Sequence, residues 1–355
     1  MKIGNCDIGN KLFLAPMADV TDTAFRKISA EYGAGFTFTQ MVSALGIIEN
    51  EFESLRYLTF NRSEKPIGVQ LLGSDFGIIR EAVKEVSKFN PDLIDLNCGC
   101  SVDKVTNYNF GSALLDDPKT IGKLVDTMVH SSNGIPISIK VRLGKDKNHI
   151  NVIETAKAAE ENGASVIFVH ARMRNDKYST VVQTEWIKKV KDELKIPVVG
   201  NGSVFTPADA KKMINDTGCD SVMIARGALG NPFLFQRYNA MLDTGNDPGE
   251  PEIETVTEVL LKHIALVVKD YGEINSFDKI KKLAVWYFKN YPGIDNFLEK
   301  VFALTNVSEL INLINTHTGD IKSKKFKLIE MSEVQNKFKE RVLFWLVDNK
   351  TESVN

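Results

Sequence analysis

The chain has 355 residues, of which 43% are apolar and 25% charged, and its formal net charge is −2. These values predict a soluble globular protein with one large domain and room for a small one. The sequence has neither a signal-peptide pattern nor an apolar run long enough to span a bilayer, so we expect a cytoplasmic protein without a membrane partner. Because the net charge is slightly negative, an RNA partner would need a local basic surface.

Short apolar runs rich in β-branched and aromatic residues recur along the chain up to residue 225. They lie at 12–15, 36–40, 67–71, 93–97, 137–141, 166–170, 197–200 and 221–225. Segments with helical spacing separate them, including 75–89, 119–132, 152–163 and 207–218. Alternating strands and helices, without a GxGxxG loop after the first strand, predict a (β/α)₈ TIM barrel rather than a doubly wound sheet.

A linker is predicted beyond the last of these runs. The segment TGNDPGEPE at 244–252 is rich in Gly, Pro and acidic residues, and no strand pattern follows it. We therefore predict two domains, a barrel domain over 1–243 and a small all-helical domain over 250–355.

Polar and small residues close the predicted strands, where a TIM barrel builds its active site. They are Pro16, Met17, Ala18, Gln40, Gln70, Asn97, Cys98, Cys100, Lys140, Arg142, His170, Arg172, Asn201, Ala225 and Arg226. Each one alone has an ordinary structural explanation, and a lone histidine such as His170 is more often structural than a ligand. As a set, they predict an active site.

Two glycine-containing loops follow the last two predicted strands, VVGNGSVFTPADA at 198–210 and VMIARGALGNP at 222–232. Loops in these positions of a barrel commonly bind phosphate through backbone N–H groups, and Arg226 adds a positive charge. A phosphate site beside Gln70, Lys140 and His170 suits a flat heterocycle with a phosphate tail, which is the outline of flavin mononucleotide, FMN.

Four cysteines, Cys6, Cys98, Cys100 and Cys219, are too scattered for a disulfide framework and are expected to be thiols. A zinc site at Cys98 and Cys100 would need two more ligands, and the few histidines lack ligand spacing. No metal is therefore predicted. From the residues alone, the function of the two neighbouring thiols stays open.

The chain resembles the flavin-dependent tRNA-dihydrouridine synthase family across nearly its whole length. The matching segments are LAPMADVTDTAFR (14–26), VQLLGSD (69–75), IDLNCGCSVDKV (94–105), GSALL (111–115), SIKVRLG (138–144), FVHARMR (168–174), VVGNGSV (198–204) and VMIARGALGNPFLF (222–235). The segment KKLAVWYFKNYPG (281–293) is similar to the family's helical tRNA-binding domain. No obligate protein partner is evident.

The resemblance implies FMN-dependent, NADPH-consuming reduction of uridine to 5,6-dihydrouridine in tRNA. Hydride would pass from reduced FMN to carbon 6, and Cys100, which matches the family's proton donor, would protonate carbon 5. A thiol with a pKa of about 8.5 is mostly protonated at neutral pH. The implied FMN contacts are Pro16, Met17, Ala18, Gln70, Lys140, His170, Asn201, Gly202, Ser203, Ala225 and Arg226. Cys98 is interpreted as a packing residue.

A second set of residues is assigned to the substrate RNA. It comprises Asn97, Lys104, Arg142, Arg172, Arg174, Tyr178, Lys281 and Lys282. The last two belong to a basic tail that also contains Lys279, Lys289 and the run KSKKFK at 322–327, beside Trp286 and Tyr287. Without the resemblance, an amphipathic helix with a solvated lysine face explains this tail equally well.

The chain departs from the family pattern at three places. Ser101 stands where the family usually has Pro, and the loop at 170–186 differs and carries an apparent small insertion before Trp186. The segment GNPF at 230–233 ends in Phe where the family more commonly has Trp, which is a conservative change. Two alternatives therefore stay open. One is an FMN barrel oxidoreductase that acts on a free pyrimidine, like a dihydroorotate dehydrogenase, and the other is a non-catalytic RNA-binding relative.

Overall fold

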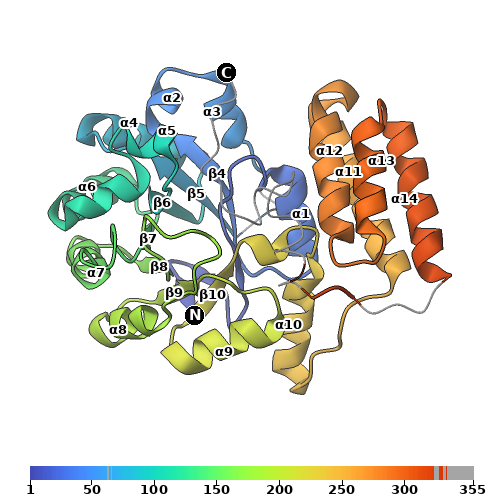
Figure 1. Ribbon diagram of the computed structural model, residues 1–355. Helices are drawn as coiled ribbons and strands as arrows, with labels where there is room; N and C mark the ends of the chain where they lie inside the picture. Colours follow the sequence, from blue (N-terminus) through green and yellow to red (C-terminus); the bar gives the residue numbers. More distant parts are fainter. Residues whose placement is uncertain (62–63, 65, 324–327, 331–332, 334–355) are drawn as a thin grey trace. The chain divides into compact units, whose positions relative to one another are not determined.

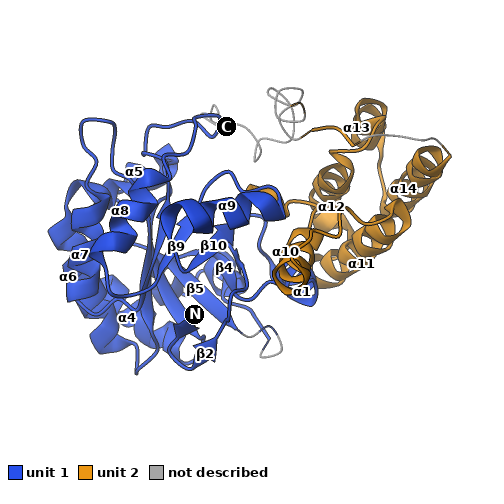
Figure 2. Cartoon of the chain, turned by 90° about the horizontal axis from the view of Figure 1, so that it is seen from below, with its two compact units in different colours: residues 1–225 blue, residues 226–355 orange. Residues whose placement is uncertain are grey.

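The computed structural model describes residues 1–61, 64, 66–323, 328–330 and 333. Contacts divide the chain into two compact units, 1–225 and 226–355 (Figure 2). Helix α10 (Phe233–Thr244) belongs to the second unit. The domain bounds of 1–243 and 250–355 stay a prediction, and most of the run KSKKFK at 322–327 lies outside the described residues.

The first unit is a parallel barrel surrounded by helices (Figure 1). Its strands are β3 (Phe13–Leu14), β4 (Thr37–Ser43), β5 (Ile67–Leu72), β6 (Leu93–Cys98), β7 (Ile137–Arg142), β8 (Val166–His170), β9 (Val198–Asn201) and β10 (Ser221–Ile224). They pair in the order β3-β10-β9-β8-β7-β6-β5-β4. A bridge between Phe13 and Phe36 brings β3 beside the segment that leads into β4. The predicted TIM barrel is confirmed.

The helices of this unit alternate with the strands. They are α1 (Thr23–Glu31), α2 (Ala44–Ile48), α3 (Phe52–Tyr57), α4 (Phe76–Ser87), α5 (Asp103–Thr106), η2 (Gly111–Asp116), α6 (Pro118–Ser131), α7 (Val152–Glu161), α8 (Glu185–Glu193) and α9 (Pro207–Thr217). Local sequence explains their ends: Thr206 and Asp209 form a capping box at the start of α9, and Gly218 ends it with a φ of 69°.

A short amino-terminal hairpin, β1 (Lys2–Ile3) and β2 (Cys6–Asp7), was not predicted, because strands of two residues show no periodicity. Its Ile3 joins the apolar cluster that contains Phe13, Phe38 and Phe168, all of them almost completely buried. Phe38 and Phe168 pack edge to face with ring centroids 5.4 Å apart. Apolar rings therefore fill the barrel core, which leaves the strand ends to polar residues.

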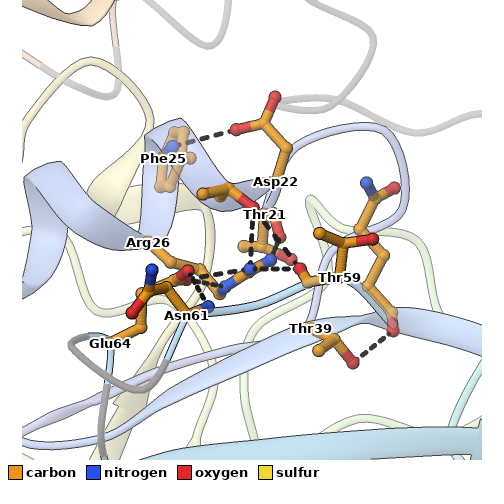
Figure 3. Close-up of polar contacts among 10 residues, drawn as sticks. Thr21, Asp22, Phe25, Arg26, Thr39, Thr59, Asn61 and Glu64 are labelled. Atoms are coloured by element: carbon orange, nitrogen blue, oxygen red, sulfur yellow. Dashed lines mark hydrogen bonds and ion pairs between the residues drawn. The ribbon is translucent and has the colours of Figure 1, made fainter. Parts of the chain in front are cut away.

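A buried arginine ties α1 to the segment before β5 (Figure 3). The Arg26 guanidinium donates to Glu64 Oε2 at 2.9 Å, to the Thr21 carbonyl at 2.8 Å and to the Thr59 carbonyl at 3.0 Å. Both charged side chains are at most 2% exposed. Because Arg26 bonds the backbone of Thr21, it also supports the turn after β3 that carries Pro16, Met17 and Ala18.

The second unit is helical in its described part. It contains η3 (Arg226–Ala228), α10, α11 (Ile253–Tyr271), α12 (Glu273–Phe288), α13 (Ile294–Ala303) and α14 (Val307–Lys322). Phe288 packs on Phe297 and His317, with ring centroids 5.1 and 5.0 Å away. Among the described helices of the whole chain, none is both long and apolar enough to cross a membrane.

Candidate active site at the carboxyl ends of the barrel strands

Strand register brings the predicted site residues to one end of the barrel. Asn97 on β6 pairs with Lys140 on β7, and His170 on β8 pairs with Asn201 on β9. Lys140 Nζ donates to Asn201 Oδ1 at 3.2 Å, across the intervening strand. The carboxyl ends of β6 to β9 therefore present amide, amine and imidazole groups side by side, as the sequence predicted.

Cys98 and Cys100 have different environments. Cys98 is fully buried, and burial raises the pKa of its thiol well above the ordinary value. Cys100 is partly exposed; burial also raises its pKa, against the opposing effects of the Val102 backbone and the Arg142 and Lys140 charges. The Cys100 thiol is therefore protonated at neutral pH.

The loop that carries Cys100 is held by short, specific contacts. The Cys100 carbonyl accepts the Ser112 N–H at 2.8 Å. A Cβ on Gly111, whose φ is 60°, would lie 2.6 Å from the Cys100 carbonyl oxygen. Position 111 therefore requires glycine for both its backbone angle and the closeness of the Cys100 loop.

Three arginines assigned to the substrate also hold loops at this end of the barrel. Arg142 is 3% exposed and donates to the carbonyls of Gly99 at 2.7 Å and Met173 at 2.9 Å. Arg172 is 2% exposed and donates to the carbonyls of Thr180 and Tyr178, both at 2.8 Å. These buried guanidinium groups fix the altered loop at 170–186 and join it to the Cys100 loop.

The third arginine lies nearer the surface. Arg174 forms a salt bridge with Asp116 at 2.8 Å and donates to the Ser112 carbonyl. Tyr178 is 37% exposed, with the Arg142 guanidinium carbon 6.0 Å from its ring centroid, and Lys104 is exposed. Contact between these residues and RNA stays a prediction.

The predicted phosphate loop after β9 has an unusual backbone. Gly202 and Ser203 both have positive φ angles, 134° and 49°, and the second is rare for a residue other than glycine. Arg172 Nη2 donates to Ser203 Oγ at 2.8 Å. Ala225 follows β10 at the end of the first unit, and Arg226 opens the second, so the joint phosphate site stays a prediction.

The turn after β3 carries the predicted flavin-lining residues. Pro16, Met17 and Ala18 are partly exposed. Thr21 Oγ1 accepts the Met17 N–H at 3.0 Å, and Gln40 Oε1 accepts the Asp19 N–H at 2.5 Å. The turn is thus bonded to Thr21, just before α1, and to Gln40 on β4.

The basic tail is less uniform than its sequence indicates. Lys282 is exposed, whereas the Lys281 side chain is 15% exposed and pairs with Asp278 at 2.9 Å. Lys289 is 3% exposed and donates to the carbonyls of Leu229 and Trp286, so it belongs to the core of its unit rather than to a basic surface. Trp286 and Tyr287, at 5% and 3% exposure, are core residues too.

The sequence matches the family model described as dihydrouridine synthase over residues 13–324. A probable tRNA-dihydrouridine synthase of Rickettsia bellii is 34% identical over 298 residues, covering 84% of this chain and 91% of that protein. The tRNA-dihydrouridine synthase B of Pseudomonas aeruginosa is 34% identical over 297 residues, covering 84% and 89%. The chain belongs to the dihydrouridine synthase family. The resemblance noted in the sequence is confirmed.

Solved structures add the fold alone. Morphinone reductase in complex with tetrahydroNAD aligns with a TM-score of 0.50 and 11% identity, over 72% of this chain and 92% of that chain. A 6-hydroxypseudooxynicotine amine oxidase from Pseudomonas geniculata aligns with a TM-score of 0.56 and 14% identity, over 74% and 52%. Both similarities agree with a TIM barrel in this dihydrouridine synthase family member.

Sequence reasoning missed one buried acid in this member of the family. Asp95 on β6 is 1% exposed and accepts hydrogen bonds from Ser138 Oγ at 2.6 Å and Gln70 Nε2 at 2.7 Å. Burial raises its pKa to about 6. The sequence does contain a sign of this acid, since Asp95 is the charged residue within the apolar run LIDLN. A carboxylate buried in such a strand is costly unless it is hydrogen-bonded.

Lys140 has the opposite shift. Burial and the Arg142 charge lower its pKa to about 8, while Asp95 and Cys100 oppose this change. Lys140 therefore stays mainly protonated at neutral pH. Among the described residues, no group of three or more His, Cys, Asp or Glu could hold a metal ion.

Proposed function

We propose that this chain reduces uridine to 5,6-dihydrouridine in tRNA, with FMN as cofactor and NADPH as reductant. The family membership supports the reaction class. The placement of Cys100 is the structural observation that carries the proposal, since it sets a protonated, partly exposed thiol at the end of β6 under the influence of the Lys140 charge.

The groups at the barrel end fit FMN. Lys140 supplies a positive charge, and the turn at Gly202 and Ser203 directly follows β9, in a position where barrel loops commonly bind phosphate. We assign the FMN contacts to Pro16, Met17, Ala18, Gln70, Lys140, His170, Asn201, Gly202, Ser203, Ala225 and Arg226. When bound, FMN supplies the hydride, taken from NADPH, that goes to carbon 6 of uracil.

Cys100 acts on the other carbon of the reduced bond. The Sγ–H proton goes to carbon 5 of uracil, which leaves a thiolate on Cys100. The charges of Arg142 and Lys140 favour this thiolate and compensate for its partial burial. A solvent proton then restores the thiol for the next cycle.

The uracil must leave its stack in the RNA to reach a thiol at the barrel end. We assign substrate contacts to Asn97, Lys104, Arg142, Arg172, Arg174, Tyr178, Lys281 and Lys282. Lys104 and Tyr178, the exposed members near Cys100, suit a phosphate and a base face respectively. The buried Arg142 and Arg172 contribute mainly by fixing the loops around the base.

The direct test uses purified protein, FMN, NADPH and unmodified tRNA transcripts. Dihydrouridine is then mapped at single-nucleotide resolution, with NADPH oxidation followed in parallel. Saturation of one or more uridines is expected, and it would also identify the position. NADPH oxidation without any dihydrouridine in tRNA would contradict the substrate assignment, and free orotate and uracil in the same assay would test the free-pyrimidine alternative.

Replacing Lys282 with glutamate is expected to weaken tRNA binding about three- to tenfold and to reduce the salt dependence by roughly one phosphate contact. Lys282 is a better target than Lys281, because Lys281 is already paired with Asp278. The matched control is Lys211→Glu, another exposed lysine, on α9. Filter binding across a salt series checks this, and equal affinities of the two variants would remove Lys282 from the RNA surface.

A further inference from the structure

A chain of hydrogen bonds joins Asp95 to the loop that carries Cys100. Asp95 Oδ2 accepts from Gln70 Nε2 at 2.7 Å, and Gln70 Oε1 accepts from Asn97 Nδ2 at 2.7 Å. Asn97 Oδ1 then accepts the backbone N–H groups of Gly99 at 3.0 Å and Cys100 at 2.9 Å. This series of hydrogen bonds runs from Asp95 on β6 to Gln70 on β5, returns to Asn97 on β6 and ends at the backbone N–H of Cys100.

The groups at the two ends of this series of hydrogen bonds determine which atoms along it donate and which accept. An ionised carboxylate only accepts hydrogen bonds, so Gln70 must turn its NH₂ group toward Asp95. Backbone N–H groups only donate, so Asn97 must turn its carbonyl oxygen toward Cys100. With these orientations, the facing groups of Gln70 and Asn97 are an acceptor and a donor. A single arrangement of both side-chain amides therefore satisfies the whole chain.

We propose that Asp95 is a positioning residue for Cys100, acting through the amide orientations of Gln70 and Asn97. Asp95 does not touch the reacting atoms in this assignment. If its acceptor is lost, Gln70 is free to rotate its amide, and Asn97 loses the partner that keeps its oxygen on the Cys100 loop. The proposal rests on the proposed function only for the catalytic consequence, because the placement of the thiol is measurable without turnover.

The other contacts of Asp95 provide a control. Ser138 on β7 donates to Asp95 Oδ1, on the side of the carboxylate that does not lead to Cys100. Removing Ser138 Oγ or Gln70 Nε2 deletes one hydrogen bond to the same carboxylate. Only the loss of Gln70 interrupts the path to Asn97, so the comparison separates positioning of Cys100 from general support of Asp95.

The experiment compares Asp95→Leu, Asp95→Asn, Gln70→Met and Ser138→Ala in the full chain. Alkylation of Cys100 by iodoacetamide is followed by peptide mass in FMN-free protein, because Gln70 is also an assigned FMN contact, with the partly exposed Cys6 as an internal reference. Dihydrouridine formation is measured separately for kcat and KM. Asp95→Asn is the conservative variant, because its amide oxygen can still accept from Gln70 while its NH₂ group donates to Ser138 Oγ.

We expect Asp95→Leu and Gln70→Met to change the Cys100 alkylation rate about fivefold or more, with Cys6 unaffected. Their kcat is expected to fall by up to about 100-fold, the scale of a misplaced catalytic group, while KM for tRNA changes about twofold at most. Ser138→Ala should have the same Cys100 alkylation rate as the unaltered protein. The rate in Asp95→Asn should be closer to that of the unaltered protein than the rate in Asp95→Leu.

Equal alkylation rates in Gln70→Met and Ser138→Ala would overturn the proposal. If Asp95→Leu does not fold, this pair can still overturn the proposal, because only Gln70→Met interrupts the path from Asp95 to Asn97. If the unaltered chain makes no dihydrouridine, the proposed function fails, while the alkylation contrast still tests the placement of Cys100.

Discussion

Replacement of Cys100 by alanine is expected to lower the rate of dihydrouridine formation by about 10²- to 10⁴-fold, the usual contribution of a general acid. NADPH oxidation should be nearly unchanged, because the proton donor acts only on the uracil. The measurement is single-turnover product formation beside NADPH consumption, which separates transfer of the proton to carbon 5 from reduction of the cofactor.

Cys98→Ala is the matched control for this variant. Cys98 is only two residues away, but it is fully buried and has no assigned part in the reaction. We expect this variant to lose some stability through a small cavity and to keep most of its turnover. Normal product formation by Cys100→Ala, or an equal loss in both variants, would contradict the acid assignment.

Replacement of Arg26 by methionine is expected to lower the free energy of unfolding by about 3–5 kcal/mol, the cost of breaking a buried ion pair. The change leaves Glu64, whose side chain is 1% exposed, without its guanidinium partner. It also removes the hydrogen bonds that the backbone carbonyls of Thr21 and Thr59 accept. Urea unfolding, with both midpoint and slope, measures the effect.

Two further variants identify the cause. Arg56→Met breaks an exposed pair with Glu53, whose side chains are 40% and 49% exposed, and should cost about 1 kcal/mol or less. The double change Arg26→Met with Glu64→Gln removes the uncompensated charge and should recover part of the lost stability. A loss in Arg26→Met no larger than in Arg56→Met would show that the buried pair contributes little.

Local sequence was sufficient to predict the strands of the barrel. Runs such as 67–71 and 137–141 became β5 and β7 with a shift of at most one residue at either end, because β-branched runs bounded by helical segments have few other ways to bury themselves in a parallel sheet. Once the strands are parallel, their carboxyl ends meet. Residues that close strands, such as Asn97, Lys140 and His170, could therefore be grouped without coordinates.

The sequence could not predict which polar side chains are buried or which groups they contact. Lysines of one sequence cluster separate into the exposed Lys282 on α12 and the buried Lys289 directly after it, because helix packing decides which side chains of this segment are covered. Arg142 was assigned to the substrate RNA, yet its guanidinium donates hydrogen bonds to the backbone carbonyls of Gly99 and Met173. Such partners lie in loops that come together only after the barrel closes.

The sequence by itself determined the barrel, its order of strands and helices, the family and the thiol at position 100, since each depends on local pattern or on motif. Only the tertiary structure decided how that thiol is held. Asp95, Gln70 and Asn97 form one hydrogen-bonded chain because the register of β5 against β6 places an amide beside a carboxylate 25 residues away. That register depends on the packing of the whole barrel, and no short stretch of sequence specifies it.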